Sequence, residues 1–212
     1  MNTIQRFVPH IGPWSQRIIL TFGMACAIAS CSIIEPRPPS RVIEPQIDLP
    51  EPIERSADYG SIIVLRPESD QTRDGRQILV RRNDSSLQVL PQYLWIEKVP
   101  DMLRSIMLDS FRYAGPFNDA APGGPADWIL HSTLRRFEAV DLGNGNVDVD
   151  IQLYLRLIEQ RSGRPTLSRT LRVERASTGR DPGDLITAFE LAMEDLLVEL
   201  NNWLVEGAAL TD

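Results

Sequence analysis

The clearest pattern in the chain is a strict alternation of apolar and polar residues over positions 147–157. The odd-numbered positions are valine, isoleucine or leucine. The even-numbered positions are Asp148, Asp150, Gln152, Tyr154 and Arg156. Side chains alternate between the two faces of a strand, so this pattern predicts a strand with one buried face and one solvated face. Residues 143–146 are glycine and asparagine, which accept positive φ, so they predict a hairpin with the preceding segment.

Shorter apolar runs bounded by turn residues predict the rest of the sheet. Strands are expected over residues 61–66, 77–82, 87–90, 128–140 and 167–173. In the strand over 128–140 the alternation slips at Arg135 and Arg136, which predicts a β-bulge.

Two segments repeat apolar residues with a helical period instead. The first begins at Pro100 and stops at Gly115. The second begins at Asp181, whose carboxylate suits the positive end of a helix, and it carries a broad apolar stripe. The order of these elements predicts an α+β fold, with a largely antiparallel sheet and two helices packed on one of its faces.

The first thirty residues have the pattern of an export signal. Arg6 and Arg17 precede an apolar run over residues 18–28, and no acidic residue occurs before Glu35. A plain transmembrane anchor is the alternative, but the run is shorter than the roughly 20 residues that span a bilayer. The pattern therefore favours export over membrane spanning.

Residues 28–31 resemble the lipobox of bacterial lipoproteins, which is an aliphatic residue, two small residues and an acceptor cysteine. The resemblance implies that the Cys31 sulfur receives diacylglycerol and that the bond between Ser30 and Cys31 is cleaved. The alternative is an ordinary secretory signal with an accidental cysteine, which the presence of only two cysteines makes a poor explanation. Ser32 stands where an aspartate would suggest inner-membrane retention in some bacteria, so it favours the outer membrane.

Prolines recur after the lipobox and predict an extended tether. At roughly 3.1 Å per residue such a tether reaches up to about 80 Å. A disordered leader with no length requirement is the alternative. The chain is thereby divided into a signal peptide (1–30), a lipidated cysteine with a proline-rich tether (31–57), a folded domain (58–207) and a tail (208–212).

The charge balance excludes some classes of partner. The whole chain has a formal net charge of −7, and removing residues 1–30 takes away two arginines and no acidic residue, which leaves −9. A body this acidic is not expected to bind nucleic acid, and it has no polybasic patch for a membrane surface. Membrane affinity is therefore expected to come from the lipid on Cys31.

The mature chain keeps one cysteine and one histidine, His131. An internal disulfide and a Cys/His metal site are thereby excluded, and so are the usual Ser-His-Asp or Cys-His arrangements unless His131 serves alone. We predict no catalytic residue, no metal and no cofactor apart from the covalent lipid. His131 is interpreted as structural, and Asp148 and Asp150 as a solvated strand face in preference to a catalytic carboxylate pair.

Four residues are candidates for partner binding. Tyr93 and Trp95 could form an exposed aromatic pair that docks a partner, although a tryptophan wedged between sheet and helix is the commoner case. Arg135 and Arg136 could contact lipid phosphate, or they could pair with the excess acid of the domain.

Several short segments, taken in order, resemble one known family. They are 77–81, Trp95, Pro100, Leu103, 126–130, 136–138 and 188–192. Over residues 60–206 the chain resembles the ABC-type transport auxiliary lipoprotein family.

The resemblance implies a non-enzymatic lipoprotein facing the periplasm. Its implied partners are an MCE-domain protein and an ABC permease and ATPase complex that move lipids between the inner and outer membranes. The ATPase lies elsewhere, because the chain has no GxxxxGK[ST] sequence. The alternative is a lipid-anchored regulator of an envelope enzyme that synthesises peptidoglycan. The number of subunits, including a homo-oligomer, is left open.

Overall fold

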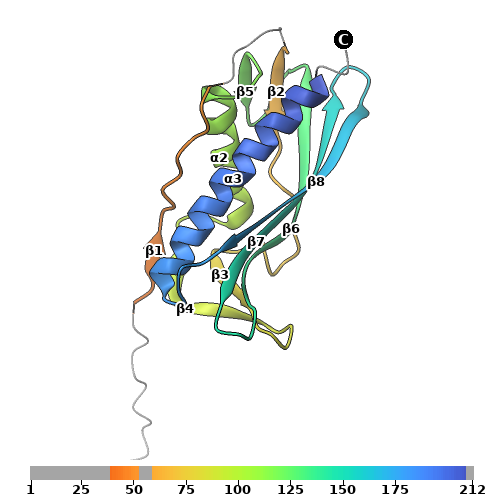
Figure 1. The fold of residues 1–212 in the computed structure, drawn as a ribbon. Helices are drawn as coiled ribbons and strands as arrows, with labels where there is room; N and C mark the ends of the chain where they lie inside the picture. Colours follow the sequence, from red (N-terminus) through yellow and green to blue (C-terminus); the bar gives the residue numbers. More distant parts are fainter. Residues whose placement is uncertain (1–38, 53–58, 209–212) are drawn as a thin grey trace, which may run out of the picture. The chain divides into compact units, whose positions relative to one another are not determined.

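The computed structural model describes residues 39–52 and 59–208, which belong to one compact unit that starts at Pro39. The signal peptide, Cys31 and most of the predicted tail lie outside the described residues. The described part has an α+β fold with an eight-stranded sheet and two helices (Figure 1). In chain order the elements are β1 (Arg41–Ile43), β2 (Ser61–Val64), β3 (Gln77–Arg81), β4 (Leu87–Trp95), α2 (Val99–Tyr113), β5 (Asp119–Ala121), β6 (Trp128–Asp141), β7 (Val147–Glu159), β8 (Arg164–Ala176) and α3 (Pro182–Ala208).

None of the helices in the described ranges is long and apolar enough to cross a membrane.

The sheet is mixed, so the expectation of a largely antiparallel sheet is wrong. Six strands follow the order β1-β4-β3-β6-β2-β5, and β7 and β8 continue from β6. Four of the pairings between described strands are parallel, namely β1 with β4, β2 with β5, β2 with β6 and β3 with β6. Apolar periodicity predicts which face of a strand is buried, but it does not predict the neighbour or the direction of pairing.

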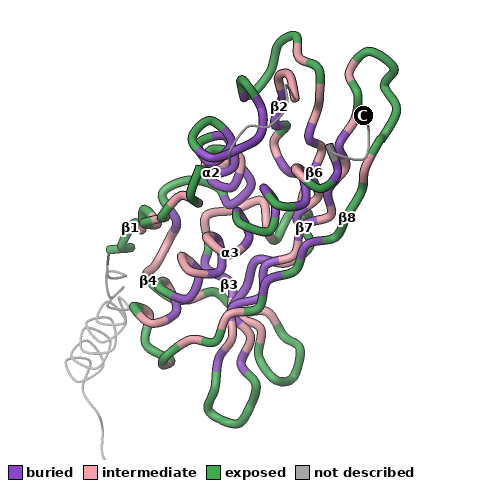
Figure 2. Tube along the Cα trace, turned by 45° about the horizontal axis from the view of Figure 1, so that its top comes forward, coloured by how far each residue is buried: buried purple, intermediate pink, exposed green. Residues whose placement is uncertain are grey.

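The long hairpin of β6 and β7 is the part of the sheet that the sequence predicts best. Gly143 and Gly145 take φ of +77° and +95° in its turn, as the hairpin prediction requires. The register shifts between Leu134 and Arg136, which confirms the predicted bulge. In Figure 2 buried and half-buried residues alternate along much of both strands, and the loop that joins them is exposed.

One hydrophobic core joins the sheet to both helices. At its centre Trp95, the last residue of β4, makes edge contacts with Phe137 of β6 and Phe189 of α3, at ring centroid distances of 6.0 and 5.4 Å. Phe137 stacks on Phe189 at 5.0 Å. Between the helices, the Asn201 amide donates a hydrogen bond of 2.9 Å to the Ser110 hydroxyl. The core therefore fixes α3 across the sheet with α2 beside it (Figure 1).

Helix α2 starts and stops where its sequence predicts. Pro100 lies in its first turn, where a missing N–H costs nothing. Asp101 places a carboxylate near the positive end of the helix. After the last turn the chain passes so close to Phe111 that a Cβ on Gly115 would lie 2.7 Å from the Phe111 carbonyl oxygen. Only glycine fits this close approach, which follows the last residue of the helix, Tyr113.

Candidate functional site

A short stretch before β2 lies against the domain, and we call residues 41–51 the strap. Its first three residues form β1, which pairs in parallel with β4 from Arg41 opposite Tyr93 to Ile43 opposite Trp95. The Ile96 N–H donates to the Ile43 carbonyl at 2.8 Å and extends this pairing. The strap is therefore joined to the sheet by backbone hydrogen bonds.

Helix α3 holds the next part of the strap. The backbone N–H of Gln46 donates to a Glu190 carboxylate oxygen at 2.9 Å, and that of Asp48 donates to Glu194 at 3.0 Å. Residues four apart lie on one face of a helix, so the two carboxylates match two alternate N–H groups of an extended chain. Hydrogen bonds to ionised acceptors are among the stronger ones.

The strap changes the predicted division between tether and domain. We expected the domain to start at residue 58, but Ile43, Ile47 and Leu49 are half-buried against the hydrophobic core. This stretch was expected to belong to the tether, but its residues lie against the domain surface. Of the predicted tether, nine residues lie between Cys31 and the strap.

We predict that removing both carboxylates, with Glu190→Ala and Glu194→Ala, loosens the strap. Each lost hydrogen bond to a charged acceptor is worth about 1.5–3 kcal/mol, so the Gln46 and Asp48 amides are expected to exchange with solvent at least about tenfold faster. Hydrogen exchange of the strap measures this. Glu199→Ala is the control, because Glu199 is exposed on α3 and has no hydrogen bond to the described strap. Unchanged exchange in the double variant would contradict the assigned contacts.

A groove of about 390 Å³ lies between the strap and α2. Its lining residues are Glu44, Pro45, Gln46, Ile47, Leu49, Ile96, Glu97, Met102, Ser105, Ile106 and Asp109. The apolar members come from the strap, from the segment before α2 and from α2 itself. The groove therefore exists only because the strap lies against the domain.

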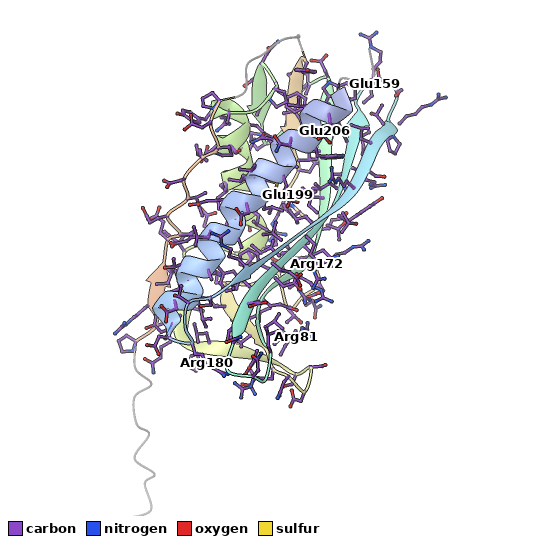
Figure 3. All side chains as sticks on the ribbon, viewed as in Figure 1. Arg81, Glu159, Arg172, Arg180, Glu199 and Glu206 are labelled. Atoms are coloured by element: carbon purple, nitrogen blue, oxygen red, sulfur yellow. The ribbon has the colours of Figure 1, made fainter. Side chains whose placement is uncertain are left out.

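Helix α3, which contacts the strap, is strongly acidic. Helix α3 has six aspartate or glutamate residues in its 27 positions and no lysine or arginine. Figure 3 shows two of them, Glu199 and Glu206, along α3, whereas Arg81 and Arg172 lie on the strands of the sheet. The excess acid therefore lies on α3, since α2 has two acidic and two basic residues.

The polar face of the sheet carries two buried carboxylates with arginine partners. The Glu138 side chain is inaccessible to solvent and is bound by Arg73 at 2.7 Å and Arg81 at 2.6 Å. Asp150, whose side chain is 2% exposed, is bound by Arg172 at 2.9 Å and Arg136 at 2.8 Å. Because each buried charge is compensated by two guanidinium groups, this cluster is a structural network and leaves no charge free for chemistry.

The network makes stability depend on pH. Burial disfavours the charged form of Asp150, but hydrogen bonds from Arg172 and Arg136 outweigh it and hold the pKa of the carboxyl below its usual value. A lowered folded-state pKa means that this stabilisation is complete above about pH 4 and is lost as the pH falls through the lowered pKa.

We predict that Asp150→Asn destabilises the domain by about 2–3 kcal/mol at pH 7, because two arginines lose a charged acceptor. The difference from the wild type is expected to shrink as the pH falls below about 4. Urea unfolding between pH 7 and pH 3 measures it. Asp148→Asn on the same face is the control, because Asp148 has no ion pair within the described ranges. A difference that is independent of pH would contradict the role assigned to Asp150.

The two aromatic candidates have different positions. Trp95 is 0% exposed and forms the centre of the core, so the structure places it as the wedge between sheet and helix and not as a docking residue. Tyr93 is half-buried, and its hydroxyl accepts a hydrogen bond of 3.2 Å from Arg41 of the strap. Tyr93 therefore contacts the chain itself at the start of the strap.

The two arginine candidates lie at the bulge of β6, but their side chains have different partners. Arg136 pairs with Asp150, as the expectation of pairing with acid required. Arg135 is exposed, and its guanidinium lies 5.1 Å from the centroid of the Tyr154 ring. His131 lies 3.2 Å from a Glu68 carboxylate oxygen and close to Arg156, on the polar face of the sheet. The structure does not bring the four candidates for partner binding, Tyr93, Trp95, Arg135 and Arg136, together into one site.

Within the described residues no group of three or more histidine, cysteine or acidic side chains could hold a metal ion. The carboxylates of the groove lie at its rim, and the two buried carboxylates of the sheet, Glu138 and Asp150, are paired with arginine.

Sequence reasoning missed the strap and its acceptors on α3. The signal was present, because residues 43, 45, 47 and 49 point inward and alternate with exposed residues, as in a strand. The prolines of this stretch concealed it, since proline is normally depleted in strands.

The comparisons with known proteins agree on fold and family. The protein XCC0632 from Xanthomonas campestris has a solved structure with 25% identity and a TM-score of 0.76, covering 81% of this chain and 98% of its own. A second solved structure, of an uncharacterized protein, has 12% identity and a TM-score of 0.59, covering 78% and 99%, and so shows the fold alone. No curated protein matches the chain.

The family comparison confirms the resemblance noted in the sequence. The model of the ABC-type transport auxiliary lipoprotein component matches residues 44–201, and this range includes part of the strap and the whole sheet after it. The family provides a non-catalytic, auxiliary part of a transport system. More than half of the chain is matched, and the chain therefore belongs to the family of ABC-type transport auxiliary lipoprotein components.

Proposed function

We propose that this protein is a lipid-anchored accessory of an MCE-type ABC transport system that moves lipids between the inner and outer membranes. Its partners are the MCE-domain protein and the permease and ATPase complex, and it acts by binding them. The match to the auxiliary lipoprotein family over residues 44–201 carries this proposal. Its anchor is the lipid on Cys31, and Ser32 after it favours the periplasmic side of the outer membrane.

The strap supports a close attachment to the membrane. With residues 41–51 held on the domain, ten residue steps separate Cys31 from Arg41. A fully extended chain covers at most about 3.5 Å per residue, so Arg41 lies within about 35 Å of the lipidated residue. This reach is under half of the about 80 Å that the whole proline-rich stretch would give.

Close attachment favours a binding role. Two or more acyl chains contribute roughly 0.8 kcal/mol per buried methylene, which gives a stable anchor. A domain confined to a thin layer above the membrane has a high effective concentration for a membrane-bound partner, so a modest interface is sufficient. An auxiliary component of this kind needs no catalytic centre of its own.

The test is the composition of the complex that the tagged protein captures from crosslinked membranes. We expect the MCE-domain protein together with the permease or the ATPase, enriched over a sample without crosslinker. Capture of a peptidoglycan synthase in their place would support the alternative role as a regulator of an envelope enzyme and would overturn the proposal.

A further inference from the structure

We propose that the groove between the strap and α2 binds a segment of a partner protein in which an apolar side chain is flanked by lysine or arginine. The groove, the acidic rim around it and the charge of the neighbouring helix carry this inference. It rests on the proposed function only for the existence of a protein partner at the membrane.

The floor of the groove is apolar and comes from three separate parts of the chain. The strap supplies Ile47 and Leu49, α2 supplies Met102 and Ile106, and Ile96 lies between β4 and α2. Ile96 is 42% exposed, which makes it one of the exposed large apolar residues of the domain. Burying apolar surface of this kind against a partner side chain contributes about 1.5–3 kcal/mol for one fully buried anchor residue.

The size of the groove fits one anchor and its neighbours. Its volume of about 390 Å³ is at the lower end of the roughly 300–1,000 Å³ found for ligand pockets. A groove of this size takes a few side chains and not a folded surface. Interfaces commonly concentrate their binding energy in such an anchor, with a polar rim around it.

The rim is acidic, and two of its three acids have no ion pair in the described part of the chain. Glu44, Glu97 and Asp109 line the groove. Neither Glu44 nor Glu97 has an ion pair in the described part of the chain, and Asp109 has one to Arg112 at 3.6 Å within its own helix. The carboxylates of the groove therefore complement a cationic segment.

The same charges argue against a phospholipid as the occupant. A lipid phosphate placed at this rim would lie among three carboxylates, and like charges in contact are strongly unfavourable. Helix α3, which also contacts the strap, has six acidic residues and no lysine or arginine, and two of them, Glu190 and Glu194, accept hydrogen bonds from the strap. A lysine or arginine beside the apolar anchor, in contrast, is attracted by these negative charges.

Site-specific photocrosslinking in cells tests the assignment on the full-length lipoprotein. Benzoylphenylalanine is placed at Ser105, which is exposed on the rim of the groove, and at Thr170, which is exposed on β8 as the control position. The crosslinked residues of the adduct are then identified by mass spectrometry. We expect protein adducts at Ser105 that are absent at Thr170, on a segment where an apolar residue has lysine or arginine as a neighbour.

Charge reversal at the rim provides the matched variants. Glu44→Lys with Glu97→Lys is expected to reduce the adduct yield about tenfold, because two attractions become repulsions. Glu199→Lys with Glu206→Lys changes the net charge of the chain equally, but on α3 away from the lining of the groove (Figure 3), and is expected to leave the yield within about twofold. Thermal unfolding of both variants checks that they fold.

The outcomes separate this inference from the proposed function. Adducts to phospholipid alone, adducts to a second copy of this chain, a yield at Ser105 no higher than at Thr170, or no effect of the rim variant would each overturn the groove assignment. An adduct of the expected chemistry on a protein outside any ABC system would retain the groove and overturn the proposed function. Capture of the transport system without crosslinks at Ser105 would retain the proposed function and overturn the groove assignment.

Discussion

Leu155→Asp is expected to abolish the folded state. Leu155 is 0% exposed on the inward face of β7, between Ser132 of β6 and Arg169 of β8 in register, and it belongs to the common hydrophobic core. An isolated carboxylate in such a place costs many kcal/mol unless it takes up a proton. Since the whole domain is expected to have about 5–15 kcal/mol of stability, one such group is enough to unfold it.

Circular dichroism and thermal unfolding of the detergent-solubilised protein measure this effect. Thr170→Asp is the matched control, because Thr170 lies on the polar face of the sheet and is exposed beside Tyr154. We expect the control to unfold within a few degrees of the wild type, since exposed substitutions are usually worth less than about 0.5 kcal/mol. A Leu155→Asp protein with a cooperative transition at the wild-type temperature would show that the inward face of β7 is wrongly assigned.

Cys31→Ser is expected to remove the lipid and leave the uncleaved precursor. The diacylglycerol is proposed to be carried on the sulfur of Cys31, and a serine hydroxyl is a far weaker nucleophile than a thiolate at neutral pH. Labelling with radioactive palmitate, together with the mass of the protein, measures both effects. The expected result is complete loss of label and retention of residues 1–30.

The second cysteine of the chain is the control for this variant. Cys26 lies within the apolar run that we predict to be removed with the signal peptide. Cys26→Ser is therefore expected to keep both the label and the cleavage. Equal palmitate labelling of Cys31→Ser and wild type would rule out Cys31 as the lipid acceptor.

Local patterns in the sequence predicted those elements whose structure depends on near neighbours. The alternation over 147–157 predicted β7, the glycines at 143 and 145 predicted its hairpin with β6, and the slip at Arg135 predicted the bulge in β6. Pro100 and Gly115 predicted the limits of α2. Each of these features depends on backbone geometry or on the period of side chains, which a sequence displays directly.

Features that depend on distant segments could not be predicted in the same way. Strands β1 and β5 have three residues each, too few to show a period, and both are held by parallel pairing with strands far along the chain. The sequence offered two interpretations of Trp95, and the choice depends on Phe137 and Phe189, which are distant in sequence.

The groove illustrates the same limit. Its walls come from the strap, from residues 96–97 and from α2, and no spacing in the sequence connects them. The acidic composition of α3 is visible in the sequence, but its meaning depends on which elements lie beside it. Glu190 and Glu194 in particular become acceptors for the strap only when the strap crosses the helix.

The central claim is that this lipoprotein acts by binding the components of an ABC transport system at the membrane. Quantitative mass spectrometry of the complex captured from crosslinked membranes tests it most directly, with the tagged wild-type protein compared with the Cys31→Ser variant at equal expression. The account predicts that the MCE-domain protein, with the permease or the ATPase, is enriched with the wild type and reduced at least about tenfold with the variant, because the domain no longer has its lipid anchor. Absence of every transport component from the wild-type complex would contradict the account.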